Sequence, residues 1–115
     1  MKRIERIEKG LVEKNNWSEI GINATLGWAY IYSKEADNDV PNFAECIWDD
    51  EIPEIVEQMK ELDIHEFTIS STFSGLIQTI VTFEDLGCTL EGTVQINERY
   101  AREKGSTIPA FKMSI

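Results

Sequence analysis

Hydrophobic and polar residues follow two different periods along this chain, and these periods predict its helices and strands. Apolar residues recur every three or four positions in several segments, as on one face of an amphipathic helix. The segments that predict helices are residues 3–13, 16–32, 49–64 and 76–86. Elsewhere apolar and polar residues alternate one by one, as in strands with one buried face. The segments that predict strands are residues 65–71, 88–97 and 108–115.

The predicted helices have recognisable ends. Asn16 begins a pattern that is typical of a capping box, at the start of the second helix. Asp49 or Asp50 is expected to cap the third helix, because acidic residues there interact favourably with the helix dipole. We expect Ser74 to cap the last helix, which ends before Gly87, the residue type that most often stops a helix.

The same spacing predicts which residues are buried. The 16–32 helix is expected to bury Trp17, Ile20, Ala24, Trp28 and Ile31. The 49–64 helix is expected to bury Ile52, Ile55, Val56, Met59 and Leu62. The strands are expected to bury Phe67 and Ile69, then Leu90, Val94 and Ile96, and finally Phe111, Met113 and Ile115.

The order of the elements predicts the fold. The strand–helix–strand order of residues 65–97 implies two parallel strands joined by a right-handed βαβ crossover. The last strand returns antiparallel and forms a C-terminal β-hairpin, whereas residues 43–48 fit either a short strand or one helical turn. The sequence therefore predicts a single α+β domain over residues 1–115. We expect a two-layer sandwich with a three-stranded mixed sheet and the N-terminal helices packed on it.

Composition indicates a globular protein without membrane contact. The chain has 115 residues, 42% of them hydrophobic, which suits one modest core. No apolar run approaches the roughly 20 residues that span a bilayer, and the charged start MKRIERIEKG lacks the apolar stretch of a signal peptide. We therefore expect a cytoplasmic location. In a reducing cytosol, Cys46 and Cys88 are expected to be buried free thiols.

The charge of the chain is acidic and unevenly distributed. Its formal net charge is −10, and residues 35–66 hold twelve acidic residues against a single base, Lys60. Such a chain has no general attraction for nucleic acid, so we expect no direct nucleic-acid binding. The acidic stretch instead indicates a surface for another protein, although acidity also serves solubility. The residues expected on this partner surface are Trp48, Asp50, Glu54, Glu57 and Glu61. A homodimer through a polar sheet face is also compatible with the sequence.

A hydroxyl-rich corner, residues 70–75, connects the first predicted strand to the last helix. Two parallel strands end at the same edge of a sheet, so this corner and the base-containing loop 98–106 are expected to lie together. Helix-start amides, hydroxyls and basic side chains then form an anion site. Its candidate residues are Ser71, Thr72, Ser74, Gly75, Arg99, Arg102 and Lys104. The corner lacks a glycine-rich phosphate fingerprint, and a Ser-capped helix beside a solvated loop explains the same residues.

No pattern of residues predicts catalysis. His65 is the only histidine, and no cysteine or other histidine stands near it in the sequence. An EF-hand counted from Asp37 lacks its glycine and has Trp48 at the position of the final glutamate. We therefore expect no enzymatic activity, no cofactor and no bound metal. Two functions remain open: a non-enzymatic interaction protein, or a small-ligand or nucleotide-binding domain that uses the 70–75 corner.

Five stretches of the chain together resemble a known group of proteins. These stretches are LVEKNNW, IWDDEIPE, FTISSTFSGLI, LGCTLEGTVQIN and IPAFKMSI. The group consists of small uncharacterised acidic proteins of Firmicutes mobile elements, seen beside or fused to helicase and DNA-methyltransferase genes. The resemblance implies an accessory protein that acts through another macromolecule. It carries no known activity, so it assigns no role to any residue.

Overall fold

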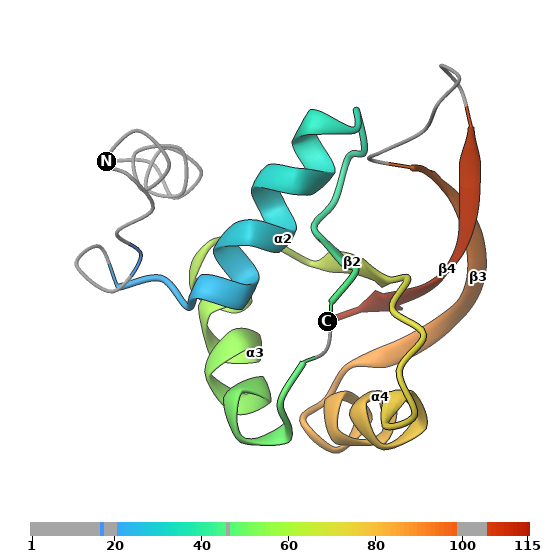
Figure 1. Cartoon of the computed structure of the whole chain (residues 1–115). Helices are drawn as coiled ribbons and strands as arrows, with labels where there is room; N and C mark the ends of the chain where they lie inside the picture. Colours follow the sequence, from blue (N-terminus) through green and yellow to red (C-terminus); the bar gives the residue numbers. More distant parts are fainter. Residues whose placement is uncertain (1–16, 18–20, 46, 99–105) are drawn as a thin grey trace.

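Helices and strands alternate along the chain in a computed structural model that describes Trp17 and residues 21–45, 47–98 and 106–115 (Figure 1). The described α-helices are α2 (Ala24–Glu35), α3 (Ile52–Glu61) and α4 (Leu76–Asp85). A 3-10 turn, η2 (Asp49–Glu51), leads directly into α3. The described strands are β1 (Asn42–Phe43), β2 (Glu66–Ile69), β3 (Thr89–Asn97) and β4 (Thr107–Ser114).

The strands form one sheet in the order β1-β2-β4-β3. β1 is parallel to β2, whereas β4 is antiparallel to both β2 and β3. The predicted parallel direction of β2 and β3 is therefore confirmed, but β4 lies between them and they do not pair. The prediction of three strands is wrong, because Asn42 and Phe43, at the start of the ambiguous 43–48 stretch, add a fourth strand. The sheet is mixed only through this short strand.

Helix α2 begins later than the sequence predicts. Its first residue is Ala24, and the Oδ1 atom of Asn23 caps it by accepting a hydrogen bond from the backbone N–H of Leu26 at 3.1 Å. Trp17 lies before the helix in a short 3-10 turn, and Asn16 lies outside the described residues. The residues that α2 buries are Leu26, Gly27, Ala29, Ile31 and Ser33. The predicted stripe is therefore wrong at Ala24, which is exposed.

Helix α3 buries the face that its spacing predicts. Its buried residues, with Leu62 just beyond its end, are Ile52, Ile55, Val56, Met59 and Leu62. The predicted cap is wrong, because Asp49 and Asp50 lie in η2 and the cap position of α3 is held by Glu51. The Glu51 carboxylate accepts a hydrogen bond from the backbone N–H of Trp48 at 3.4 Å and so closes the turn.

Helix α4 begins at the predicted residue, Leu76, and stops before Gly87 as predicted, but its cap differs. Gly87 follows the helix with φ at 96°, a backbone conformation that glycine adopts readily. At the other end the cap position is held by Gly75, and no side chain makes a capping hydrogen bond there. Ser74 is therefore not the cap. The backbone N–H of Leu76 donates to the carbonyl of Phe73 at 3.2 Å instead.

A β-bulge overturns part of the predicted inward face of β3. The register with β4 shifts between Leu90 and Gly92, and Gly92 has φ at 131°, which other residues rarely adopt. Leu90 consequently pairs with Met113, whereas Val94 pairs with Ala110 on the opposite face. The prediction that Leu90 is buried is wrong, because its side chain is 38% exposed. The prediction of strict alternation along β3 is wrong, because the extra residue at the bulge reverses the face of the sheet toward which the following side chains point.

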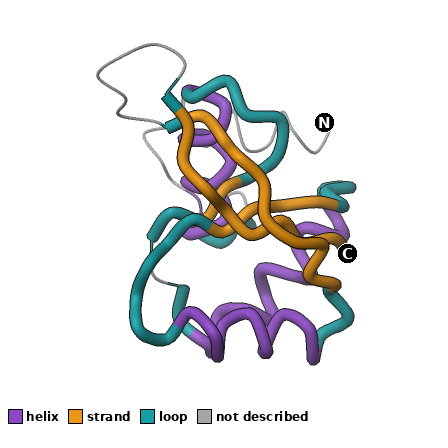
Figure 2. The backbone as a smooth tube through the Cα atoms, turned by 90° about the vertical axis from the view of Figure 1, so that its right-hand side faces the viewer, coloured by secondary structure: helices purple, strands orange, loops and turns teal. Residues whose placement is uncertain are grey.

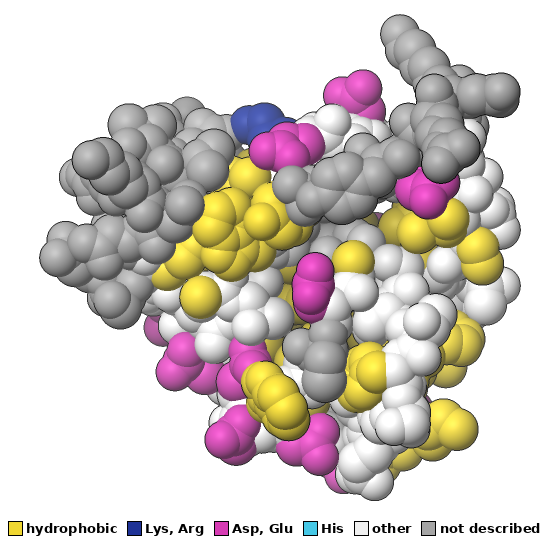
Figure 3. Space-filling model, viewed as in Figure 1, with side chains coloured by type: hydrophobic (Ala, Val, Ile, Leu, Met, Phe, Trp, Pro, Cys, Tyr) yellow, Lys and Arg dark blue, Asp and Glu magenta, His cyan; other side chains and the backbone are white. Residues whose placement is uncertain are grey.

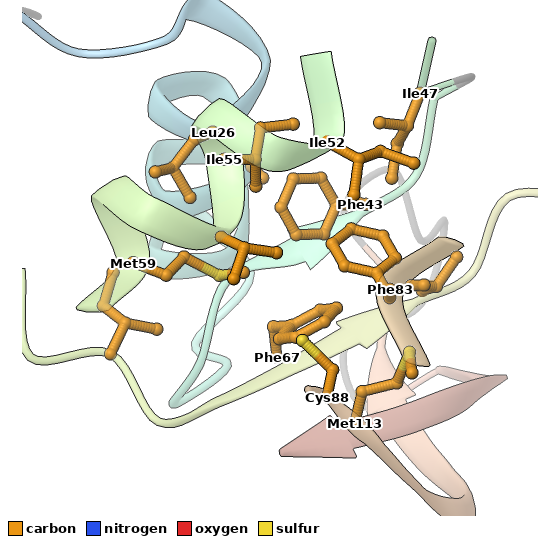
Figure 4. Packing of buried hydrophobic residues seen from close by; sticks show 14 of the residues in the cluster. Leu26, Phe43, Ile47, Ile52, Ile55, Met59, Phe67, Phe83, Cys88 and Met113 are labelled. Carbon is orange, nitrogen blue, oxygen red and sulfur yellow. The ribbon is translucent and has the colours of Figure 1, made fainter. Parts of the chain in front are cut away.

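The hydrophobic core lies against one face of the sheet (Figure 4). Side chains of α2, α3 and α4 all contribute to it, as the predicted two-layer α+β arrangement requires. At its centre Phe43, Phe67 and Phe83 are in contact, with ring centroids 4.9 to 6.2 Å apart. Figure 2 shows the strands together with α4 running below them. Cys88 is a buried free thiol in this core, as predicted, and Cys46 lies outside the described residues.

Candidate functional site

The predicted partner residues form one exposed acidic row that begins at Trp48 and continues along α3. Trp48 is 69% exposed, and Asp50 follows it in η2. Glu54, Glu57 and Glu61 recur every three or four positions along α3 and are all exposed, so they share its outer face. We call this surface the α3 acidic face (Trp48, Asp50, Glu54, Glu57 and Glu61).

Few basic residues neutralise the acidic surface of the described part of the chain. The described residues include sixteen aspartates and glutamates but only three lysines. Of these lysines, Lys112 pairs with Glu66 at 3.3 Å and Lys34 lies over the ring of Tyr30. No described lysine forms an ion pair with the α3 acidic face. Figure 3 shows acidic side chains grouped over α3, at the lower left. This surface therefore attracts cationic groups.

His65 forms an exposed pair with Asp63. Its Nε2 atom lies 2.8 Å from Oδ1 of Asp63, and both side chains are mostly exposed. Within the described ranges, no three His, Cys, Asp or Glu residues lie together in a way that would hold a metal ion. No helix in those ranges is both long enough and apolar enough to cross a bilayer.

The hydroxyl-rich corner is divided between interior and surface. Ser71 is buried, and its Oγ atom has no hydrogen-bond partner among the described residues, whereas Thr72 and Ser74 are exposed. Ser71 and Thr72 border a hollow of about 200 Å³ against β4. The apolar residues that line it are Ile69, Leu76, Pro109, Ala110 and Phe111. The corner therefore meets a mainly apolar hollow and not a cradle of polar groups.

The basic half of the predicted anion site, Arg99, Arg102 and Lys104, lies outside the described residues. The strands that lead to it extend beyond the corner. Ile69, the last residue of β2, is level with Thr93 across β4, and β3 continues four residues further to Asn97. That continuation spans about 13 Å. Figure 1 shows the chain after β2 turning toward α4, while the β3–β4 hairpin extends the other way. The anion site thus stays a prediction.

A groove beside α2 is a feature that the sequence does not predict. It consists of two hollows of about 280 and 260 Å³, both lined by Tyr32, Asn42, Ala44 and Glu45. Trp28 lines the first hollow and stacks on Tyr32, with ring centroids 4.9 Å apart and 27° between the ring planes. We call it the α2–β1 groove (Trp28, Tyr32, Asn42, Ala44 and Glu45). The four-residue spacing of the two aromatics marks them as neighbours on a helix, but it indicates core packing equally well.

Comparison with known proteins places the chain in a family without adding an activity. No curated protein and no solved structure matches the chain. A family model described as "Domain of unknown function (DUF7698)" matches residues 25–115, from the first turn of α2 onward. This match includes both the α3 acidic face and the α2–β1 groove. Because it covers most of the chain, the protein belongs to the DUF7698 family.

Proposed function

We propose that this chain is a non-enzymatic interaction protein whose α3 acidic face binds a basic surface of another protein. One observation carries the proposal: a row of exposed carboxylates, with Lys60 as the single base on the same helix, runs from a tryptophan that is 69% exposed. A row of exposed carboxylates is ordinary on a soluble domain, and so is a single exposed tryptophan. The combination of the exposed tryptophan just before η2 with the carboxylates along α3 is what favours a partner.

The chemistry of the face indicates the kind of partner. Lysine and arginine side chains lay their aliphatic stems on an aromatic ring while their charged ends reach a carboxylate. Trp48 and Asp50 supply such a pair at one end of the row, and three glutamates continue it. Attraction between exposed opposite charges speeds association and weakens as salt increases. Binding to the partner should therefore decrease steeply with ionic strength.

The resemblance to proteins of mobile elements supports a more specific partner. Helicases and DNA methyltransferases hold the nucleic-acid backbone with basic surfaces. An acidic face that binds such a surface would compete with DNA for it. Under this proposal the protein acts in the cytoplasm as an accessory factor, and adding it should release DNA from the partner enzyme.

Capture of partners from an extract of the native host tests the proposed function. Replacing Glu54, Glu57 and Glu61 together by Lys should remove the captured proteins, because the face then repels a basic surface. A control with two reversed charges, Glu84→Lys with Asp85→Lys, changes the exposed acidic residues of α4 and should leave capture unchanged, and the double variant Glu57→Lys with Glu61→Lys gives the comparison at equal charge. Circular dichroism checks that each variant is folded. Capture of the same proteins by the triple variant and the control would show that the proposal is wrong.

An anion-binding function of the 70–75 corner is the alternative, and one observation favours it. The Oγ atom of buried Ser71 has no partner among the described residues, and an unpaired buried hydroxyl is an available hydrogen-bonding group. If phosphate or nucleotides bind there, they should raise the melting temperature, and the shift should shrink when Arg102 and Lys104 become Ala. Equal melting temperatures with and without these ligands would exclude the alternative.

A further inference from the structure

The α2–β1 groove combines a strand edge, two aromatic rings and carboxylates. We propose that it accepts an extended segment of the basic partner, containing lysine or arginine, which pairs beside β1 as an additional strand. The inference rests on the proposed function in taking the partner to be basic, but it uses a different surface. The groove would therefore be a second contact with the same partner, and strand addition would be the mode of recognition.

The backbone of β1 directs hydrogen-bonding groups toward the groove. The carbonyls of Pro41 and Phe43 accept hydrogen bonds from Thr68 and from the residue after β2, at 2.9 and 3.0 Å. Successive backbone groups of a strand point in opposite directions, so those of Asn42 point away from β2. Asn42 lines the groove, as does Ala44, the residue after β1. An extended segment that lies there meets the N–H and C=O groups that strand addition uses.

The side chains of the groove select for positive charge. Trp28, in the first hollow, stacks on Tyr32, which lines both hollows, and Figure 3 shows hydrophobic side chains gathered over α2. Aromatic faces attract ammonium and guanidinium groups. Glu45 lines both hollows and Glu98 lines the second, whereas no described lining residue is a lysine or an arginine. The carboxylates of Glu45 and Glu98 can therefore each pair with a basic side chain on the same face of an extended segment.

The opposite edge of the sheet is less suited to an additional strand. The carboxamide of Asn38 holds both the backbone N–H and the carbonyl of Asn97, at 2.9 and 3.1 Å, and so occupies the carboxyl end of β3. The bulge between Leu90 and Gly92 interrupts the other end. These two features leave only the middle of β3 available, which favours the edge at β1.

A fluorescein-labelled octapeptide of alternating Lys and Thr, with blocked ends, tests the groove by fluorescence anisotropy at low salt. We expect the full chain to bind it, and replacing Glu45 and Glu98 by Gln to weaken binding by roughly fivefold, as the loss of two exposed charge pairs predicts. The matched variant Glu84→Gln with Asp85→Asn removes the same charge from α4, outside both proposed surfaces, and should change the affinity by less than about twofold, because screening limits distant exposed charges. A third variant, Glu57→Gln with Glu61→Gln, removes the same charge from the α3 acidic face.

Two altered peptides separate side-chain from backbone recognition. A peptide with norleucine in place of lysine keeps the aliphatic stem and should not bind measurably. A peptide that keeps its lysines but is N-methylated at alternate residues loses the N–H groups that pair with a strand, and it should also bind more weakly. Equal affinity of the methylated and unmethylated peptides would overturn strand addition. In amide NMR spectra the binding peptide should shift the signals of Asn42 and Ala44.

The outcomes distinguish the groove from the acidic face. If the octapeptide loses affinity for the Glu57/Glu61 variant and not for the Glu45/Glu98 variant, the groove proposal is wrong and the proposed function stands. Equal losses in both variants would indicate only general attraction to an acidic chain, and would also overturn the groove. If the unaltered chain does not bind the octapeptide at low salt, the groove proposal is wrong, and capture by the α3 acidic face remains the separate test of the proposed function.

Discussion

Gly27 allows the ring of Trp17 to lie directly against α2. A Cβ atom at position 27 would stand 2.7 Å from Cδ2 of Trp17, closer than packed carbon atoms approach. Alanine favours a helix over glycine by about 1 kcal/mol, but an extra carbon forced against a rigid ring costs about 1–3 kcal/mol. We therefore expect Gly27→Ala to lower the free energy of unfolding by about 1 kcal/mol, measured by urea denaturation.

The Trp17→Leu background provides the control for this prediction. Leucine removes the rigid ring, so Gly27→Ala should there be neutral or stabilising, as helix propensity alone predicts. An equal destabilisation in both backgrounds would show that the contact with Trp17 is not the cause.

The buried thiol of Cys88 should make stability depend on alkaline pH. Burial raises the pKa of this thiol, and the positive charge of Lys60 lowers it by less. In the unfolded chain the thiol ionises near roughly pH 8.5, while the folded protein retains the proton to higher pH. The unfolded state then binds fewer protons, so the free energy of unfolding falls as pH rises above about 8.5. Urea denaturation between pH 7 and 10 should show a shallower fall for Cys88→Ala. Equal slopes would contradict the prediction.

At the scale of elements, one side chain joins the loop after α2 to the end of β3. The carboxamide of Asn38 bonds both backbone groups of Asn97, as a neighbouring strand would. We expect Asn38→Ala to lower the free energy of unfolding by about 1–2 kcal/mol, because two backbone groups lose their partner. Hydrogen exchange at the Asn97 amide should accelerate in the same variant.

An exposed hydrogen bond nearby gives the matched comparison for Asn38. The Oγ1 atom of Thr107 donates to Oε1 of Gln95 at 3.1 Å, between exposed side chains of β4 and β3. Thr107→Ala should change the free energy of unfolding by no more than about 0.5 kcal/mol. Similar losses for the two variants would mean that the Asn38 contact has no special role at the strand edge.

At the scale of the whole molecule, the acidic side chains of the described residues repel one another. Sixteen acidic residues and three lysines stand on it, within a chain of formal net charge −10. Like charges that are crowded on a folded surface destabilise the compact state, and salt screens them. We expect the melting temperature to rise between 20 and 300 mM sodium chloride, on the order of a few degrees. Glu57→Gln with Glu61→Gln should reduce that rise, and an unchanged or falling melting temperature in salt would contradict the prediction.

Local periodicity predicts those features that a single element determines. The buried face of α3 follows from apolar residues every three or four positions, and the end of α4 follows from Gly87. Phe111 and Met113 face the core together because β4 alternates without interruption there. The glutamates of the α3 acidic face were predictable for the same reason, since helical spacing alone brings them to one side.

Contacts between distant segments decided those features of the fold that local periodicity does not predict. Alternation cannot reveal that β4 enters between β2 and β3, nor that the bulge at Gly92 sends Leu90 and Val94 to opposite faces, because pairing depends on partners far along the chain. The α2–β1 groove exists only where α2 and β1 come together in space. The sequence by itself therefore determined the longer helices and strands of the described residues, most of their buried faces and the acidic row. The tertiary structure alone decided strand order, register and the groove, since each is a relation between residues that the chain brings together only by folding.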